Sequence, residues 1–195
     1  IIYVHQLFFI FLLIFSLKKK NLDKNFDKNL IYVLLATVCD VMPLRNFNRI
    51  LAINILKNFD INKNDLFKKI FLQKKINKPF EIDDLGFVIG PILNSAGRLG
   101  DANLIVNLLT SKKKKKKEQI IDKLIQLNEK RKKIENDVLG EMDFNKISKN
   151  KQKIIIENNK IIHEGIIGII ASRLKEYFNK PTIVLTKYND IYKAS

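Results

Sequence analysis

The chain has 195 residues and a formal net charge of +16, from 36 basic and 20 acidic side chains. This length suits one domain with a proper core, or pieces of two, and the single cysteine excludes an internal disulfide and fits a reducing cytoplasm. The positive charge favours polyanionic partners such as nucleic acid, although AT-rich codon usage alone would also supply many Lys, Asn, Ile and Phe residues.

An apolar run opens the chain at residues 1–17, and three lysines follow it. We expect this run to be a buried core helix. A signal anchor or short membrane span is the alternative, because the run lies at the lower edge of the roughly 17–25 residues that a span needs. The chain begins at Ile1 without Met and ends at Ser195 in what reads as a strand, so we expect an internal segment of a longer protein.

The next residues predict a loop, a strand and a helix. Residues 18–29 are polar and predict the loop. Leu30–Cys39 is a continuous apolar run with β-branched residues, which is typical of a strand buried on both faces in a parallel sheet. Asp40–Asn48 predicts a turn. Residues 48–59 place apolar side chains at mostly helical spacing and predict an amphipathic helix.

Shorter elements follow up to residue 109. We expect a short helix at 65–72 and a helix start or turn at 81–86. Residues 87–99 contain two glycines and a proline, which predict a loop-rich segment. A helix over 101–109 has Asp101 as its expected N-cap.

A long helix is predicted over residues 118–138. Six consecutive lysines, Lys112–Lys117, precede it and indicate a solvated loop or helix start. Residues 128–133 are all polar, so we expect the helix to be wet over much of its length. Such a helix suits a connector between two domains.

The last 45 residues or so change pattern and predict a second α/β domain. Ile154–Ile156 predicts a strand, residues 165–178 a helix, and Thr182–Thr186 a second strand. Strands alternating with a helix in this way are typical of α/β units.

Asp40 is the first candidate for chemistry. It follows the predicted strand, and ligands of open α/β sheets gather at the carboxyl ends of strands. A carboxylate there can hold a divalent metal ion through hard oxygen, but a turn or capping Asp is an equally simple interpretation. One carboxylate cannot build a two-metal site, so further ligands would have to come from outside this chain.

Two glycine-containing segments are candidates for binding phosphate. In residues 90–99, glycines permit close approach of a ligand, Asn94 can donate and accept hydrogen bonds, and Arg98 can grip a phosphate. Residues 163–168 place a histidine and two glycines at a predicted helix start, where free N–H groups and the helix dipole favour anions. A structural turn and tight strand–helix packing are the respective alternatives.

Taken together, these stretches resemble the RecJ branch of the DHH phosphoesterases. Ala36–Leu44 is similar to that branch's Gly-Thr-Val-Ala-Asp-Val-Val-Pro-Leu element, and Gly90–Asp101 to its Gly-Pro-Arg-Leu-Asn-Ala-Ala-Gly-Arg-Leu segment. Leu127–Glu135 resembles its inter-domain helix, and His163–Leu174 the opening of its DHHA1 domain. Lys193–Ser195 resembles the start of its Lys-Gly-Ser-Gly-Arg-Ser motif. These matches run in family order.

The resemblance implies an α/β fold in three parts. Residues 1–110 would form the C-terminal part of a parallel-sheet DHH domain, 111–145 a long connecting helix, and 146–195 the start of a DHHA1 α/β domain. Asp40 would be catalytic by binding Mn²⁺ or Mg²⁺. The residues that would contact nucleic acid are Asn94, Arg98, His163, Gly165, Gly168, Arg173 and Ser195.

The implied parent protein is a cytoplasmic exonuclease that digests single-stranded DNA from the 5′ end in repair and recombination. It would need no small-molecule cofactor, would not be a membrane protein, and would reach single-strand-binding protein or helicase partners through its other parts. Two departures matter: Ile92 replaces the family's Arg, and the Asp-rich and Asp-His-His motifs lie upstream of Ile1 in the family. We therefore expect this chain alone to be inactive. The alternatives are a DHH phosphodiesterase for short oligonucleotides or cyclic dinucleotides, and a non-catalytic basic remnant that binds nucleic acid or a membrane.

Overall fold

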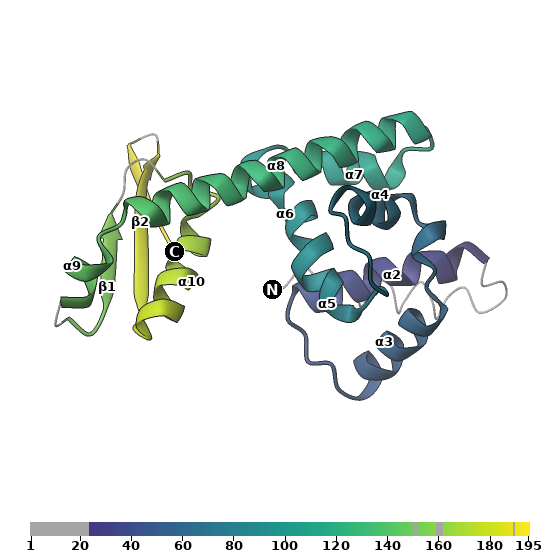
Figure 1. Cartoon of the computed structure of the whole chain (residues 1–195), viewed down its shortest axis with the longest axis horizontal. Helices are drawn as coiled ribbons and strands as arrows, with labels where there is room; N and C mark the ends of the chain where they lie inside the picture. Colours follow the sequence, from purple (N-terminus) through teal and green to yellow (C-terminus); the bar gives the residue numbers. More distant parts are fainter. Residues whose placement is uncertain (1–23, 150–151, 159–161, 189) are drawn as a thin grey trace. The chain divides into compact units, whose positions relative to one another are not determined.

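A computed structural model of the chain describes residues 24–149, 152–158, 162–188 and 190–195, except for the side chains of 24–28 and 188. The described part is mostly helical, with one small sheet (Figure 1). It divides between Pro91 and Ile92 into two compact units. The predicted domain limits at residues 110 and 145 stay a prediction.

The first unit is built from helices among its described residues. They are α2 (Lys24–Cys39), α3 (Asn46–Asn58), the 3-10 turn η1 (Ile61–Lys63), α4 (Asp65–Gln73), α5 (Ile82–Asp84) and the π-helical η2 (Leu85–Ile89). Phe67 is fully buried at the centre of an aromatic cluster with Tyr32, Phe59 and Phe80. The helices predicted over 48–59 and 65–72 are confirmed, and the helix start or turn predicted at 81–86 corresponds to the short helix α5 and the beginning of η2.

The strand predicted at Leu30–Cys39 is wrong, because these residues form the second half of α2. The helix already begins at Lys24, so the loop predicted for 18–29 is also wrong over its described part. The buried side chains of Ile31, Leu34 and Leu35 repeat at helical spacing. A short apolar run without alternation is compatible with either element, and here the preceding polar residues extend it to helical length.

The loop predicted at 87–99 is wrong as well, since η2 leads directly into α6 (Gly90–Leu99). Pro91 is the second residue of α6, directly after the π-helical turn η2, and it has no N–H to donate to that turn. Gly90 gives room to α2: a Cβ there would lie 2.4 Å from Cys39 Sγ. The Cys39 thiol also donates to the Leu85 carbonyl at 3.8 Å, one turn before Gly90. Gly90 therefore makes room for the packing of Cys39 and does not break the helix.

The second unit continues α6 and adds a long helix and the sheet. Its other elements are α7 (Asn103–Thr110), α8 (Lys114–Glu141), α9 (Phe144–Lys149), β1 (Ile155–Asn158), α10 (Ile167–Phe178), β2 (Thr182–Tyr188) and β3 (Ile191–Ala194). The long helix and the strand–helix–strand pattern are confirmed. β1 pairs with β2 in parallel and β2 with β3 antiparallel, in the order β1-β2-β3.

One layer of helix covers this sheet. Ile166, Ile170 and Leu174 of the α10 segment are fully buried in a core that includes Val184 of β2 and Val138 of α8. The first half of α8 contacts α7, and the second half of α8 contacts α10 (Figure 1). No described helix is long and apolar enough to cross a membrane, and the apolar run at 1–17 lies outside the described residues.

Candidate nucleic-acid interface

Asp40 lies exposed at the carboxyl end of α2, where its N–H donates to the Ala36 carbonyl at 3.0 Å. The next residue, Val41, has a left-handed backbone with φ of 55° and ends the helix. The C-terminal end of a helix carries partial negative charge, so a carboxylate there is stabilised by a nearby cation. Burial, and secondly the charge of Asp40, raises the pKa of the neighbouring Cys39 thiol.

Asp40 fits a divalent metal ion as a single hard-oxygen ligand. Within the described ranges, no group of three or more His, Cys, Asp or Glu side chains is arranged to hold a metal ion.

Asn94 and Arg98 both lie on α6. Of the two, Arg98 has a hydrogen bond to a residue far away in the described part of the sequence. Asn94 is exposed. The half-buried Arg98 donates from Nη1 to the Gly165 carbonyl at 3.0 Å. Burial and the charge of Arg131 lower the pKa of the Arg98 guanidinium, and Glu135 partly offsets them. Ile92, which stands where the family has Arg, is 1% exposed. An apolar side chain therefore fits the core at this position.

Gly165 lies directly against the last turn of α6. A Cβ at this position would lie 2.1 Å from the Arg98 carbonyl oxygen, so only glycine allows this approach. The Gly165 N–H donates to Nδ1 of the exposed His163 at 3.1 Å, and the Ile166 N–H donates to the His163 carbonyl at 2.9 Å. These two N–H groups therefore close a turn before α10.

Gly168 and Ser195 are also brought together. A Cβ at Gly168 would lie 3.0 Å from Ser195 Oγ. Ser195 extends the antiparallel pairing by exchanging two backbone hydrogen bonds with Val184, at 2.9 and 3.0 Å. Next to it, the Lys193 ammonium pairs with Glu164 in the loop before α10. The end of the chain and the start of α10 thus share one surface.

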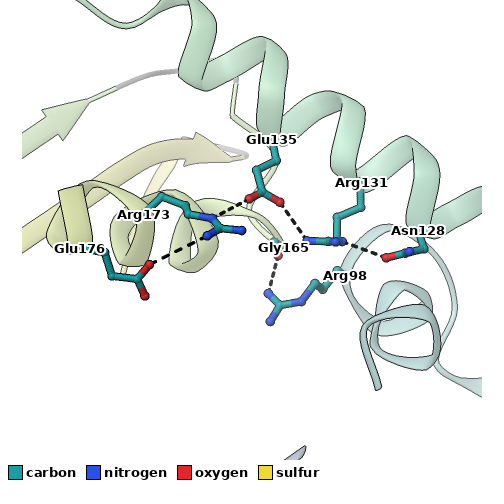
Figure 2. Close-up of polar contacts among 7 residues, drawn as sticks. All are labelled: Arg98, Asn128, Arg131, Glu135, Gly165, Arg173 and Glu176. Atoms are coloured by element: carbon teal, nitrogen blue, oxygen red, sulfur yellow. Dashed lines mark hydrogen bonds and ion pairs between the residues drawn. The ribbon is translucent and has the colours of Figure 1, made fainter. Parts of the chain in front are cut away.

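Arg173 belongs to a polar network that joins α8 to α10 (Figure 2). Its Nε donates to Glu135 Oε1 at 3.1 Å, and Arg131 Nη1 donates to Glu135 Oε2 at 3.0 Å. Arg131 Nε donates to Asn128 Oδ1 at 3.2 Å. Glu176 Oε2 lies 3.9 Å from Arg173 Nη1. The Arg173 side chain is 59% exposed, and an exposed guanidinium suits a phosphate.

The sequence of the chain is similar to named exonucleases over most of its length. It is 35% identical over 182 residues to the single-stranded-DNA-specific exonuclease RecJ of Haemophilus influenzae, which covers 88% of the chain. It is 33% identical over 165 residues to the RecJ of Salmonella typhimurium, which covers 81%. The chain belongs to the RecJ family. It spans 31% and 29% of the lengths of these two relatives.

The fold agrees with this RecJ relationship. A crystal structure of RecJ in complex with Mg²⁺ from Thermus thermophilus matches with a TM-score of 0.68 and 24% identity, over 82% of this chain and 25% of that one. A crystal structure of exonuclease RecJ bound to manganese matches with a TM-score of 0.66 over 82% of this chain and 40% of that one. No protein-family model matches the chain.

Sequence reasoning missed the RecJ chain's buried polar side chains on α8. Asn128 and Glu135 are 2% and 5% exposed, so the expectation that 128–133 is wet is wrong at Asn128. A signal was present: residues 121, 124, 128, 131, 135 and 138 repeat at spacings of three and four along one helix face. Polar residues that continue an apolar stripe indicate a buried network.

Proposed function

We propose that this chain is part of a metal-dependent exonuclease that hydrolyses single-stranded DNA from its 5′ end in repair and recombination. The observation that carries the proposal is the similarity, over 88% and 81% of the chain, to relatives named single-stranded-DNA-specific exonucleases. The formal net charge of +16 supports a polyanionic substrate. We propose that the protein acts in the cytoplasm on single-stranded DNA. Its proposed protein partners are a single-strand-binding protein or a helicase.

Asp40 is proposed to supply one oxygen ligand to catalytic Mn²⁺ or Mg²⁺. Its exposure and its place at the negative end of α2 support this role. RecJ proteins in solved structures are bound to Mg²⁺ or Mn²⁺, which supports the choice of metal. When bound, such ions activate a water and offset charge that develops on the phosphodiester. Asp40 itself would fix the position of one ion.

The proposed path of the DNA strand follows the surface built by α6, the 163–168 loop and α10. Arg98 and Arg173 would contact backbone phosphates, and Asn94 would donate or accept beside them. His163 and Ser195 would line the same path. In this proposal Gly165 and Gly168 act indirectly, because their missing side chains let Arg98 and Ser195 come close.

The metal role is tested in a longer protein that includes the upstream Asp-rich and Asp-His-His motifs. Asp40→Ala should lower Mn²⁺-dependent release of nucleotides from 5′-ended single strands by more than about 100-fold, because a metal ligand is lost. Asp83→Ala, which removes another exposed carboxylate of the same unit, is the matched control and should keep its rate. Unchanged turnover in Asp40→Ala would remove this residue from the metal site.

The 195-residue chain by itself should bind single-stranded DNA but should not digest it. Measurable Mn²⁺-dependent digestion by the purified chain would show that its own residues complete the catalytic site, contrary to this proposal.

A further inference from the structure

Glu135 is a buried carboxylate in the most polar stretch of α8. Its side chain is 7% exposed and accepts one hydrogen bond on each oxygen, from Arg131 Nη1 at 3.0 Å and from Arg173 Nε at 3.1 Å. A buried carboxylate stays charged only when it is paired in this way. The two arginines come from different elements, α8 and α10, so Glu135 fixes one against the other (Figure 2).

Arg131 acts as the inner support of this arrangement. Its side chain is only 12% exposed and is held at both ends, by Asn128 Oδ1 at 3.2 Å and by Glu135 Oε2 at 3.0 Å. Such a guanidinium cannot reach a strand on the surface. It binds Oε2 of Glu135, while Oε1 of the same carboxylate accepts from Arg173 of α10.

Arg173 is the outer member, with a side chain that is 59% exposed. Glu135 holds its Nε, and Glu176 Oε2 lies 3.9 Å from Nη1, beyond hydrogen-bond distance. A guanidinium has a second edge, formed by its two terminal nitrogens, which matches two oxygens of a phosphate. The grip on Nε leaves that edge directed away from Glu135.

We propose that Glu135 is a positioning residue, which orients the Arg173 guanidinium so that its outer edge receives a backbone phosphate of the bound strand. This inference rests on the proposed function, because it assumes that single-stranded DNA is the ligand. It makes a counterintuitive prediction about sign. If only net charge mattered, removal of the Glu135 charge would strengthen binding to a polyanion. Positioning requires the opposite.

The test measures binding of a fluorescently labelled oligothymidylate to the 195-residue chain by anisotropy, in low salt. Glu135→Gln should weaken binding by about tenfold, a size typical of groups coupled through one network. Glu176→Gln is the matched control, because it also removes a carboxylate beside Arg173. At 3.9 Å from Arg173 Nη1, the Glu176 carboxylate makes no hydrogen bond that the substitution could break. Its affinity should stay equal or increase slightly.

Arg173→Lys is the second variant, and its exposed position makes it a safe change for folding. It keeps the positive charge but loses Nε, so it should also bind about tenfold more weakly. In the double variant, Glu135→Gln should add nothing further to Arg173→Lys. Circular dichroism and the thermal midpoint of each variant show that the fold is retained, and a purely structural role would not produce this coupling in affinity.

The outcomes separate the two ideas. Equal or tighter binding by Glu135→Gln, or wild-type affinity in Arg173→Lys, would overturn the positioning role while the proposed function stands. If Glu135→Gln does not fold, Arg173→Lys alone decides the question. If the unmodified chain fails to bind single-stranded DNA, the proposed function of this surface fails, and the positioning role with it.

Discussion

Gly165→Ala tests whether the 163–168 loop and α6 are held together as the structure shows. The new Cβ would lie 2.1 Å from the Arg98 carbonyl oxygen and 2.9 Å from its carbon. Both are backbone atoms, so the loop must move away by about an ångström, which costs about 1–3 kcal/mol as overpacking. That movement also weakens the hydrogen bond from Arg98 Nη1 to the Gly165 carbonyl. A bond of this charged kind contributes about 1.5–3 kcal/mol.

We therefore expect Gly165→Ala to lower the free energy of unfolding by about 2–5 kcal/mol, measured by urea titration with circular dichroism. Gly97→Ala is the matched control on α6, because a Cβ there meets nothing within 4 Å. It should raise stability by up to about 1 kcal/mol, since alanine favours a helix over glycine. A Gly165→Ala chain within about 0.5 kcal/mol of the unmodified one would refute the close approach of loop and helix.

Two further predictions concern helix starts. Asn64→Ala should lower the free energy of unfolding by about 0.5–2 kcal/mol, because the side-chain Oδ1 of Asn64 caps α4 by accepting from the N–H groups of Leu66 and Phe67. Asn64→Asp keeps an acceptor and should lose less, and equal losses would contradict the capping role. Lys116→Glu should raise the thermal midpoint in low salt, because the first turn of α8 carries lysines and no acidic residue at the positive end of the helix dipole. The gain should shrink in 0.5 M salt, and a gain independent of salt would argue against an electrostatic cause.

The sequence predicted the elements whose signals are local. Residues 48–59, 65–72 and 118–138 have apolar side chains at helical spacing, and all three lie in helices. The strand–helix–strand pattern after residue 153 was also predicted, because its period changes visibly. The likeness to the RecJ family came from several short motifs in the right order, which no composition argument supplies.

The failures arose where tertiary packing decided the outcome. Leu30–Cys39 is apolar enough for a strand, and only the burial of Ile31, Leu34 and Leu35 shows its helical face. Gly90 reads as a helix breaker, but it makes room for Cys39. The partner of Glu135, Arg173, lies 38 residues later in the chain, so the only local sign of its burial was its place in the three- and four-residue spacing of one α8 face.

The Gly90–Cys39 contact also supplies the chain with its own chemical reporter. Cys39 is the single thiol in 195 residues, and burial raises its pKa, so its reactive thiolate is scarce at neutral pH while the contact is closed. When α2 separates from the start of α6, the thiol gains solvent and its alkylation accelerates. A rise in the rate of labelling of this half-buried thiol by a maleimide or iodoacetamide therefore reports the opening, without any engineered residue.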